Sequence, residues 1–591
     1  MNDFSGYITQ TPVDGSTESL PLKNGTFLCL SLSGNEILHT NDQFALILSG
    51  EMHYSGNRNI SAATAFLSAV TKLESVSDAI NQAKGAFSLV LVDMMMGNVH
   101  LVVDKFGTHP LYYAYESGRI CFSNKLNNII RIRPELKVIS QQSIYQYIYF
   151  HCIPAPDTIY QQVFKVQAGQ CVRIEKNTAK VESYYVPDFT PSTDSSETLK
   201  SKLFIHLESS VKNAMEGLNP EKTGAFLSGG LDSSTVSGFF SRFVGPHKAK
   251  TFTIGFHAQG YDESEFAKIT ADHFQTDHSV YYLTPDNIGE TLKKIAAYYD
   301  EPFGNSSALP AYYCAKFAGE RGVEVMLAGD GGDELFAGND RYAKQKIFEW
   351  YFKIPGPLRA LFIELPLNML PAERIPGIKK VASYVRQAKV RLPARLQTYN
   401  FLKQFKPEEV FNEAFLAQVD PDRPDRLFEA RYNEPSSGDA QNRMLYLDWK
   451  FTLADNDLVK VNNMVHLAGL QVRYPMLDDD LVELSTRIPS ETLLPGNQLR
   501  AFYKEATTGF LSDKTINKTK KGFGLPFGVW LRERAELKTM AYENVRNLKQ
   551  YGFFKESFLE HAIKMHSSEH PGYFGELIWI LMMLNLWLEA H

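Results

Sequence analysis

A glycine- and serine-rich loop constrains the fold of this chain more than any other feature. The loop is Ser228-Gly229-Gly230-Leu231-Asp232-Ser233-Ser234, and it follows the apolar residues 225–227. A helix is expected to start near Thr235. In such a strand–loop–helix unit, glycines let the backbone approach phosphate oxygens, while hydroxyls and the helix N-terminus donate hydrogen bonds to them. The loop lacks the Gly-Lys-Ser/Thr ending of a Walker A loop. We therefore predict a pyrophosphate cradle, with Asp232 placed to bind magnesium.

Length and composition limit the class of protein. A chain of 591 residues predicts two or more domains, and a hydrophobic fraction of 44% is enough for large cores. A net charge of -6 argues against a nucleic-acid partner. The five cysteines form no CxxC pair, which favours a reducing cytoplasm and argues against a zinc site. We expect no signal peptide and no membrane partner, because the most apolar stretch, residues 577–588, is too short to span a bilayer and fits a buried terminal helix.

The pattern of apolar residues changes near residue 190. The first ~185 residues are strand-rich, and a segment of Ser, Thr, Pro and Asp at 187–197 is expected to be a linker. Beyond it, strands alternate with helices, which predicts a parallel sheet with ligands at the carboxyl ends of its strands. From about residue 340 the chain is expected to be mainly helical. The expected strands are 44–48, 87–92, 99–103 and 111–114, then 225–227, 249–256, 279–283 and 324–328, with helices at 203–217 and 262–274.

Two further loops carry chemistry. The first is Ala328-Gly329-Asp330-Gly331-Gly332-Asp333-Glu334, which follows the strand expected at 324–328. Its glycines permit a tight loop, and Asp333 is placed to complete a magnesium site with Asp232, since magnesium shared with phosphate is commonly held by one or two carboxylates. The second is Lys518-Thr519-Lys520-Lys521-Gly522-Phe523, a basic loop that can deliver a lysine to developing negative charge.

These three loops, in this order, resemble the asparagine synthetase family and its relatives. Further matching segments are Ile254-Gly255-Phe256, Asp300-Glu301-Pro302 and Val472-Arg473-Tyr474-Pro475-Met476-Leu477-Asp478. In the N-terminal half, residues 104–113 resemble the family's D-R-x-G-x-x-P-L-Y-Y segment. The resemblance implies an α/β multidomain protein. Residues 1–190 would form an Ntn-type αββα glutaminase-like domain, and residues 191–591 an ATP-pyrophosphatase α/β domain with a parallel sheet and a helical extension.

The resemblance also implies a reaction and its cofactors, ATP and Mg²⁺. A substrate carboxylate attacks the α-phosphorus of ATP to give an acyl-adenylate and pyrophosphate, and a nitrogen nucleophile then releases AMP. Lys520 would be the catalytic lysine, and Asp232 and Asp333 would hold magnesium. The residues expected to bind ATP or pyrophosphate are Leu227, Ser228, Gly229, Gly230, Asp232, Ser233, Ser234, Ile254, Gly255, Ala328, Gly329 and Asp330.

The glutaminase half departs from the family pattern. Glutamine-using members have a Cys directly after the initiator Met, whose thiol and free amine do the nucleophilic chemistry. Here position 2 is Asn2, and the nearest cysteine is Cys29. The family's N-G-E segment is Ser49-Gly50-Glu51, and residues 60–64 stand where the acidic glutamine-binding residue is expected. The arginine that binds the glutamine carboxylate also has no evident counterpart. We therefore expect no glutamine hydrolysis and a domain kept as a scaffold.

The expected substrate region also differs from the family. It contains Glu334, Asn339 and Tyr342, and the usual Gly-Gly-Tyr after the acidic loop is Ala337-Gly338-Asn339. The usual V-D-R-x-S-M segment is Val461-Asn462-Asn463-Met464-Val465-His466, and Gln471 replaces a Glu. These changes remove charge near the second substrate. Neutral drift at packing positions explains them equally well.

Four hypotheses follow. We favour an amide synthetase that uses an amine or ammonia instead of glutamine, in specialised-metabolite or peptide biosynthesis. It would be similar to the Cys-lacking relatives that include β-lactam and carbapenam synthetases and lasso-peptide cyclases. This hypothesis allows a peptide substrate, and it allows a homodimer or a biosynthetic partner protein. The alternatives are an ammonia-using asparagine synthetase, a non-catalytic scaffold, and another ATP-pyrophosphatase chemistry such as tRNA thiolation or argininosuccinate formation. The last lacks the N-terminal half seen here.

Overall fold

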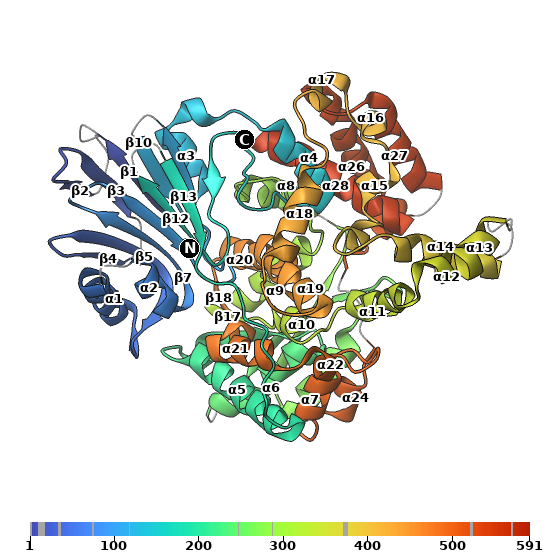
Figure 1. Cartoon of the computed structure of the whole chain (residues 1–591), viewed down its shortest axis with the longest axis horizontal. Helices are drawn as coiled ribbons and strands as arrows, with labels where there is room; N and C mark the ends of the chain where they lie inside the picture. The colour runs from blue at the N-terminus through green and yellow to red at the C-terminus, as the bar shows by residue number, and fades with distance from the viewer. Residues whose placement is uncertain are drawn as a thin grey trace.

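The chain folds into two α/β halves that pack against each other (Figure 1). The structure, a computed structural model, describes residues 3–9, 18–32, 37–73, 76–116, 119–175, 178–245, 247–286, 288–369, 376–519, 524–568 and 571–591. The N-terminal half, blue in Figure 1, contains two stacked sheets, and the rest of the chain forms a larger, mainly helical half around one parallel sheet.

The N-terminal half is built from two antiparallel sheets with helices outside them. One sheet has the strand order β11-β9-β10-β1-β3-β2, and the other has the order β13-β12-β8-β7-β5-β4, with β6 paired to β5. The bounds of the strands are β1 Phe4–Thr9, β2 Glu18–Pro21, β3 Phe27–Leu32, β4 Ile37–Thr40, β5 Phe44–Tyr54, β6 Asn57–Arg58, β7 Lys84–Asp93, β8 Val99–Val103, β9 Tyr112–Glu116, β10 Arg119–Ser123, β11 Phe164–Lys165, β12 Gln170–Glu175 and β13 Thr178–Ser183. The helices are α1 Asn59–Leu73, α2 Val76–Gln82, α3 Leu126–Ile132 and α4 Gln141–Phe150.

Strand β5 shows why this half forms layers. Successive side chains of a strand point to opposite faces. Ala45 and Ile47 lie in the core between the two sheets, while Leu46 and Leu48 lie in the core under α1 and α2. Because both faces are buried, the strand is a continuous apolar run. The result is the αββα layering of the Ntn-type fold, as predicted from the sequence.

The C-terminal half is organised by a five-stranded parallel sheet in the order β16-β15-β14-β17-β18. Its strands are β14 Thr223–Phe226, β15 Lys250–Phe256, β16 Asp277–Leu283, β17 Val325–Leu327 and β18 Gln471–Arg473. Helix α5 Ser196–Met215 precedes β14, and the helices between β14 and β17 are α6 Leu231–Phe243, α7 Ser264–Phe274, α8 Ile288–Tyr298 and α9 Ala308–Gly319. Separate buried clusters form with α5 and α6 and with α8 and α9, so apolar side chains cover both faces of the sheet.

The remaining helices form the extension that the sequence predicts. They are α10 Gly332–Leu335, α11 Asp340–Lys353, α12 Gly356–Arg359, α13 Leu365–Met369, α14 Pro376–Lys389, α15 Phe401–Gln404, α16 Pro407–Val410, α17 Glu413–Leu416, α18 Arg423–Asn433, α19 Ala440–Asp448, α20 Leu458–Leu467, α21 Asp479–Arg487, α22 Ser490–Leu493, α23 Ala501–Ala506, α24 Asp513–Ile516, α25 Phe527–Glu533, α26 Ala535–Asn547, α27 Glu556–Ser568 and α28 Pro571–Ala590. A π-helical segment, η5 Trp449–Asp457, joins α19 to α20. The domain boundary near residue 190 stays a prediction; the described residues 184–195, which precede α5, form no helix or strand.

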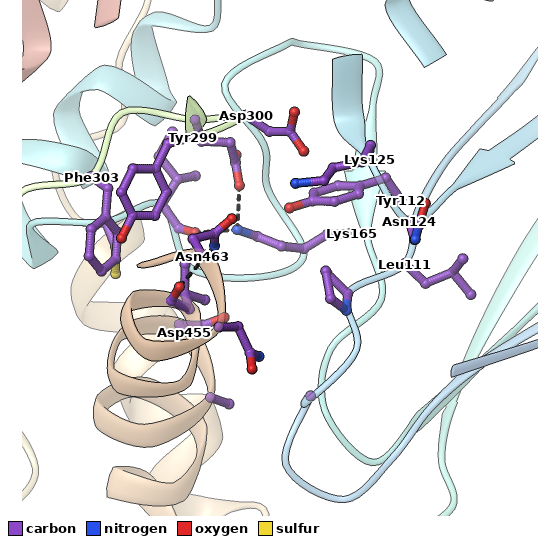
Figure 2. Close-up of a pocket in the computed structure, with 18 of the residues that line it drawn as sticks. Leu111, Tyr112, Asn124, Lys125, Lys165, Tyr299, Asp300, Phe303, Asp455 and Asn463 are labelled. Atoms are coloured by element: carbon purple, nitrogen blue, oxygen red, sulfur yellow. Dashed lines mark hydrogen bonds and ion pairs between the residues drawn. The ribbon is translucent and has the colours of Figure 1, made fainter. Parts of the chain in front are cut away.

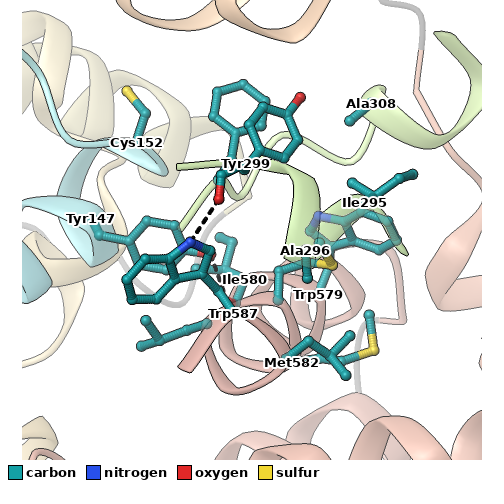
Figure 3. Close-up of a cluster of buried hydrophobic side chains, with 14 of the residues drawn as sticks. Tyr147, Cys152, Ile295, Ala296, Tyr299, Ala308, Trp579, Ile580, Met582 and Trp587 are labelled. Atoms are coloured by element: carbon teal, nitrogen blue, oxygen red, sulfur yellow. Dashed lines mark hydrogen bonds between the residues drawn. The ribbon is translucent and has the colours of Figure 1, made fainter. Parts of the chain in front are cut away.

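Helix α28 is longer than the apolar stretch that predicted it. By length and composition, its residues 572–590 pass the test for a membrane-crossing helix, and within the described chain no other helix does. However, 78% of that window is buried inside the protein. Figure 3 shows its tryptophans packed in the core: the Trp587 indole donates a hydrogen bond to the Tyr299 carbonyl (2.9 Å), and the Tyr147 hydroxyl donates to the Ile580 carbonyl (2.8 Å). These contacts fit a core helix.

Candidate active site

The predicted phosphate loop lies between β14 and α6, at the carboxyl end of the strand. The Ser228 and Ser233 hydroxyls are 3.0 Å apart, and the Ser233 hydroxyl accepts a hydrogen bond from the Ser228 amide (3.2 Å). Gly229 has a φ of 70°, and a Cβ there would lie 2.4 Å from the carbonyl carbon of Phe266 in α7. The tight turn therefore requires glycine. Hydrogen bonds between its own residues hold the turn, so the loop is preorganised.

Two of the residues predicted to bind ATP or pyrophosphate have side chains that pack in the protein core. Ser234 is fully buried, and its hydroxyl is 2.9 Å from that of Thr270 in α7. Leu227 is also buried, against Ala267 and Ala271. Ser234 therefore ties α6 to α7, one helical position beyond the residues that form the turn. Its predicted contact with pyrophosphate is not supported by this placement.

The acidic loop packs directly on the phosphate loop. A Cβ at Gly332 would lie 2.1 Å from Oδ1 of Asp232, and a Cβ at Gly329 would lie 2.9 Å from the Ser233 amide nitrogen. Gly331 has a φ of 102° and is the N-cap residue of α10. The glycines of this loop therefore serve close approach between two segments about a hundred residues apart, and they bring Asp232 and Asp333 to one place.

An arginine that the sequence interpretation did not single out joins these two carboxylates. The guanidinium of Arg500 donates from Nη1 to Asp232 Oδ2 (3.0 Å) and to Asp333 Oδ1 (2.9 Å), and from Nη2 to Asp232 Oδ1. Its side chain is only 4% exposed. The residue caps α23 with a φ of 59°, in the left-handed region. Arg500 lies in no recognisable sequence motif, so its role becomes visible only from its contacts with the two aspartates in the folded chain.

The carboxylates of Asp232 and Asp333 fit a magnesium site shared with phosphate. Both carboxylates accept from the same guanidinium nitrogen of Arg500, so their negative charges converge where a positive charge is stabilised. Among the described residues, no group of three or more His, Cys, Asp or Glu side chains could hold a metal by itself. Magnesium in nucleotide sites is bound by one or two carboxylates, with phosphate and water completing the shell. The pair suits that arrangement.

A second charged cluster lies beside the acidic loop. Burial raises the pKa of Asp330 to about 6, although Lys460 opposes the shift. The Lys460 ammonium donates to Asp457 Oδ1 (2.7 Å). Burial also raises the pKa of Glu334, and the nearby Asp333 and Asp457 add to the effect. Three carboxyl groups and one lysine thus share a largely buried space next to the predicted magnesium ligands.

The predicted substrate residues take different places. The Asn339 side chain caps α11 by accepting from the Arg341 amide (3.1 Å), which gives it a structural role. The Tyr342 hydroxyl donates to Asp448 Oδ2, and its ring is buried. Arg341, which lies between them and was not predicted, forms an ion pair with Asp448 and lines a cavity.

The predicted catalytic Lys520 lies outside the described residues. The start of the same basic loop is described, and it lies at the phosphate loop. The Lys518 ammonium is 3.3 Å from the Ser228 carbonyl and 3.1 Å from Glu263 Oε2. The position of Lys518 beside the phosphate loop is compatible with the predicted role of Lys520, which follows two residues later in the sequence. Ile254 and Gly255 lie on β15, where a Cβ at Gly255 would lie 2.7 Å from the ring of Tyr282, so packing accounts for that glycine.

The N-terminal half contacts the C-terminal half through the segment that replaces the family's glutamine-binding strand. Glu51 forms an ion pair with Arg473 of β18. Asp479 accepts from the Gly85 amide (2.8 Å) and pairs with Lys105. Cys29 is fully buried in β3 and pairs with Tyr7 of β1. Asn2 lies outside the described residues.

Two cavities open near these segments. One, of about 80 Å³, lies between the halves and is shown in Figure 2. In it, the Lys165 ammonium is 2.7 Å from Glu301 Oε2, and Lys125 and Asp300 lie nearby. The other, of about 370 Å³, is lined by residues 148–152 of the N-terminal half and by helices of the C-terminal half, and it includes Arg341.

The fold and site define a two-domain protein: an Ntn-type domain joined to an α/β domain with a pyrophosphate-type loop. Comparison with known proteins gives the family. The asparagine synthase model matches residues 203–589, and the glutamine amidotransferase domain model matches residues 59–185. The chain belongs to the asparagine synthetase family. As a member, it is an ATP-dependent carbon–nitrogen ligase that forms AMP and pyrophosphate.

Individual relatives are distant. The chain is 31% identical to "Putative asparagine synthetase [glutamine-hydrolyzing] 2" of Methanocaldococcus jannaschii, over 67% of this chain and 75% of that protein. It is 25% identical to "Asparagine synthetase [glutamine-hydrolyzing] 1" of Bacillus subtilis, over 86% of this chain and 78% of that protein. It is 22% identical to "Amidase chyE" of Penicillium rubens, over 90% of this chain and 85% of that protein.

Proposed function

We propose that this chain adenylates a substrate carboxylate and joins it to an amine or ammonia without hydrolysing glutamine, in specialised-metabolite or peptide biosynthesis. The observation that carries the proposal is the altered glutamine site. Asn2 stands where the family has its nucleophilic cysteine, and Ser49 replaces the glutamine-binding Asn. Glu51 of the same segment forms an ion pair with Arg473 of the other half. An Asn side chain carries no thiol for the nucleophilic step.

In this proposal the C-terminal half performs the activation. The Ser228–Ser233 turn and the N-terminus of α6 bind pyrophosphate oxygens through backbone amides and hydroxyls. Asp232 and Asp333 would hold a magnesium ion, which would neutralise charge on the phosphates. Arg500 holds the two carboxylates together. Lys520 stabilises negative charge on the phosphates and the tetrahedral intermediate, a role that the position of Lys518 supports.

Proton transfer belongs to the second charged cluster. An attacking ammonium must lose a proton, and a buried carboxyl with a pKa near the working pH accepts one efficiently. Asp330, with its pKa raised to about 6 by burial, has that property. Lys460, paired with Asp457, limits the accumulation of negative charge there. Glu334 and Tyr342 lie in the same region and would border the substrate.

The test is ATP–pyrophosphate exchange by the purified chain with Mg²⁺ and a panel of carboxylates, together with a glutaminase assay. We expect exchange that depends on one class of carboxylate, and no release of glutamate from glutamine. Product formation supported by glutamine better than by an ammonium salt would overturn the proposal.

An ammonia-using asparagine synthetase is the second candidate, because the relatives from Bacillus subtilis and Methanocaldococcus jannaschii are named asparagine synthetases, although those names describe glutamine-hydrolysing enzymes. It predicts that aspartate supports exchange and that aspartate with a high ammonium concentration gives asparagine. No asparagine under those conditions would exclude this candidate and leave the first in place. A chain that shows no exchange with any carboxylate and binds no ATP would instead be a scaffold.

A further inference from the structure

The larger cavity has no role in the reaction as described so far. Its volume is about 370 Å³, within the range of small-molecule sites. Its lining residues come mainly from α4, α15, α18, η5 and α28. Figure 1 labels α4, α15, α18 and α28 in the upper part of the molecule. Its aromatic lining residues are Tyr149, Phe150, Tyr399, Phe401, Phe428, Phe451 and Tyr573.

These aromatic side chains form a preorganised wall. The rings of Phe150 and Phe451 are stacked with centroids 5.1 Å apart, and Phe428 lies 5.1 Å from Phe451. Tyr399 is 70% exposed. It therefore gives the cavity an aromatic edge that a ligand can reach from solvent. Such a surface favours a flat apolar group over a small ion such as ammonium.

The carboxyl groups that line the cavity outnumber its cationic side chains. Arg341 is neutralised by Asp448, whose side chain is 5% exposed, and Arg341 also donates to the Thr452 hydroxyl (2.9 Å). Glu576 of α28 accepts from the Ser306 hydroxyl (3.1 Å). In the part of the chain that the structure describes, no Lys, Arg or His forms an ion pair with Glu576. The lining thus carries one carboxyl group more than it has cations.

Helix α19 and η5 connect this cavity to the predicted active site. Asp448, Phe451 and Thr452 line the cavity, and Trp449 in the same stretch donates from its indole to the Glu334 carbonyl in the acidic loop (3.0 Å). Asp448 also accepts from the Tyr342 hydroxyl. A molecule in the cavity therefore lies one helical turn from residues that contact the acidic loop.

We propose that this cavity binds the amine substrate, a primary amine on an aromatic body, with the ammonium group at Glu576. The inference rests on the proposed function, since it names the nitrogen donor of that reaction. An amine supplies the missing cation, whereas a carboxylate would add a further negative charge to the lining. Free ammonia would leave the aromatic wall without a partner. Burial raises the pKa of Glu576 to about 7, because it disfavours the charged form of the carboxyl, and a bound ammonium group would favour that form again.

Binding by the intact chain tests the proposal by titration calorimetry with three matched probes: 2-phenylethylamine, 3-phenylpropanoate and 2-phenylethanol. We expect the amine to bind most tightly, with its affinity reduced at least ~10-fold in Glu576→Gln. Glu556→Gln, on the exposed face of neighbouring α27, is the matched control and should bind as the parent does. Tyr399→Ala, at an exposed position where folding is not at risk, should weaken the amine and the alcohol alike.

The outcomes separate this inference from the proposed function. Tighter binding of the phenylpropanoate, equal binding of all three probes, or no binding of any would overturn the amine site, and so would full affinity in Glu576→Gln. ATP–pyrophosphate exchange is measured in parallel, and it reports on the carboxylate alone. Exchange without amine binding would remove the cavity assignment only, whereas amine binding without exchange would remove the proposed function and leave the cavity as an amine site without that reaction.

Discussion

The two halves use their acidic residues differently. In the C-terminal half, Asp232 and Asp333 come from two separate loops and converge on one nitrogen of Arg500. In the N-terminal half, Glu51 stands in the segment that resembles a glutamine-binding strand, and it pairs with Arg473 across the domain interface. Charges that converge at strand ends, beside a preorganised loop, suit a ligand. A charge paired across the interface contributes to packing, and the difference suggests which half kept its chemistry.

The sharpest way to break this comparison is to neutralise the convergent carboxylates. We expect Asp232→Asn or Asp333→Asn to reduce ATP–pyrophosphate exchange by ~10²–10³-fold or more, because each removes charge that holds the cation at the phosphates. Asp480→Asn is the control. Asp480 forms an exposed pair with Lys84 at the interface (2.9 Å) and should leave exchange unchanged. Normal exchange in either site variant would refute the predicted magnesium ligands.

Removing Arg500 tests the same site through stability. Arg500→Met leaves two carboxylates facing each other without their buried cation, a change that typically costs about 3–5 kcal/mol. The thermal midpoint should fall in metal-free buffer and recover in part with Mg²⁺ and ATP, which bring positive charge back to the carboxylates. Arg487→Met removes an exposed pair with Asp188 (3.6 Å) and should change the midpoint little. If the metal-free Arg500→Met variant is as stable as the parent, the contacts of Arg500 with the two carboxylates contribute nothing to the free energy of unfolding.

The sequence predicted the layers and the loops better than the side chains that meet across them. Both folds followed from apolar patterns and short motifs, and the strands at 44–48, 87–92 and 99–103 lie within β5, β7 and β8. Strand β18 was missed because it has three residues and enters the sheet from a segment about 145 residues after β17. No periodicity is visible at that length.

The site residues were missed for a related reason. Arg500 and Arg341 are single residues outside any motif, and only the folded chain brings them to Asp232, Asp333 and Asp448. Ser234 belongs to the loop by sequence, but the helical turn points it at Thr270 instead. Sequence patterns report neighbours along the chain, whereas these roles depend on neighbours in space.

Within the C-terminal half, Glu576 offers a pH test of whether an unneutralised carboxyl is held for a ligand. Its pKa in the folded chain is about 7, above the ordinary 4.5, because burial disfavours the charged form. The folded state therefore binds the proton more tightly, and stability is lost as pH rises from about 4.5 to 7. At pH 8, Glu576→Gln should raise the unfolding free energy by no more than about 3 kcal/mol, and the thermal midpoint should rise with it. At pH 4.5 the thermal midpoint should be unchanged. Equal midpoints at pH 8 would show that Glu576 carries no such penalty.

The smallest effect is expected at the interface pair of the N-terminal half. The side chain of Glu51 is 43% exposed and that of Arg473 is 21% exposed, and Arg473 keeps its bonds to the Ala214 and Glu216 carbonyls when Glu51 is changed. Glu51→Gln should therefore cost no more than ~1 kcal/mol and change exchange by less than ~2-fold. Glutamate release from glutamine should be absent from parent and variant alike. If the parent instead made product with glutamine and Glu51→Gln lost that activity alone, Glu51 would be a glutamine ligand, and the contrast between the halves would fail at the residue on which it rests.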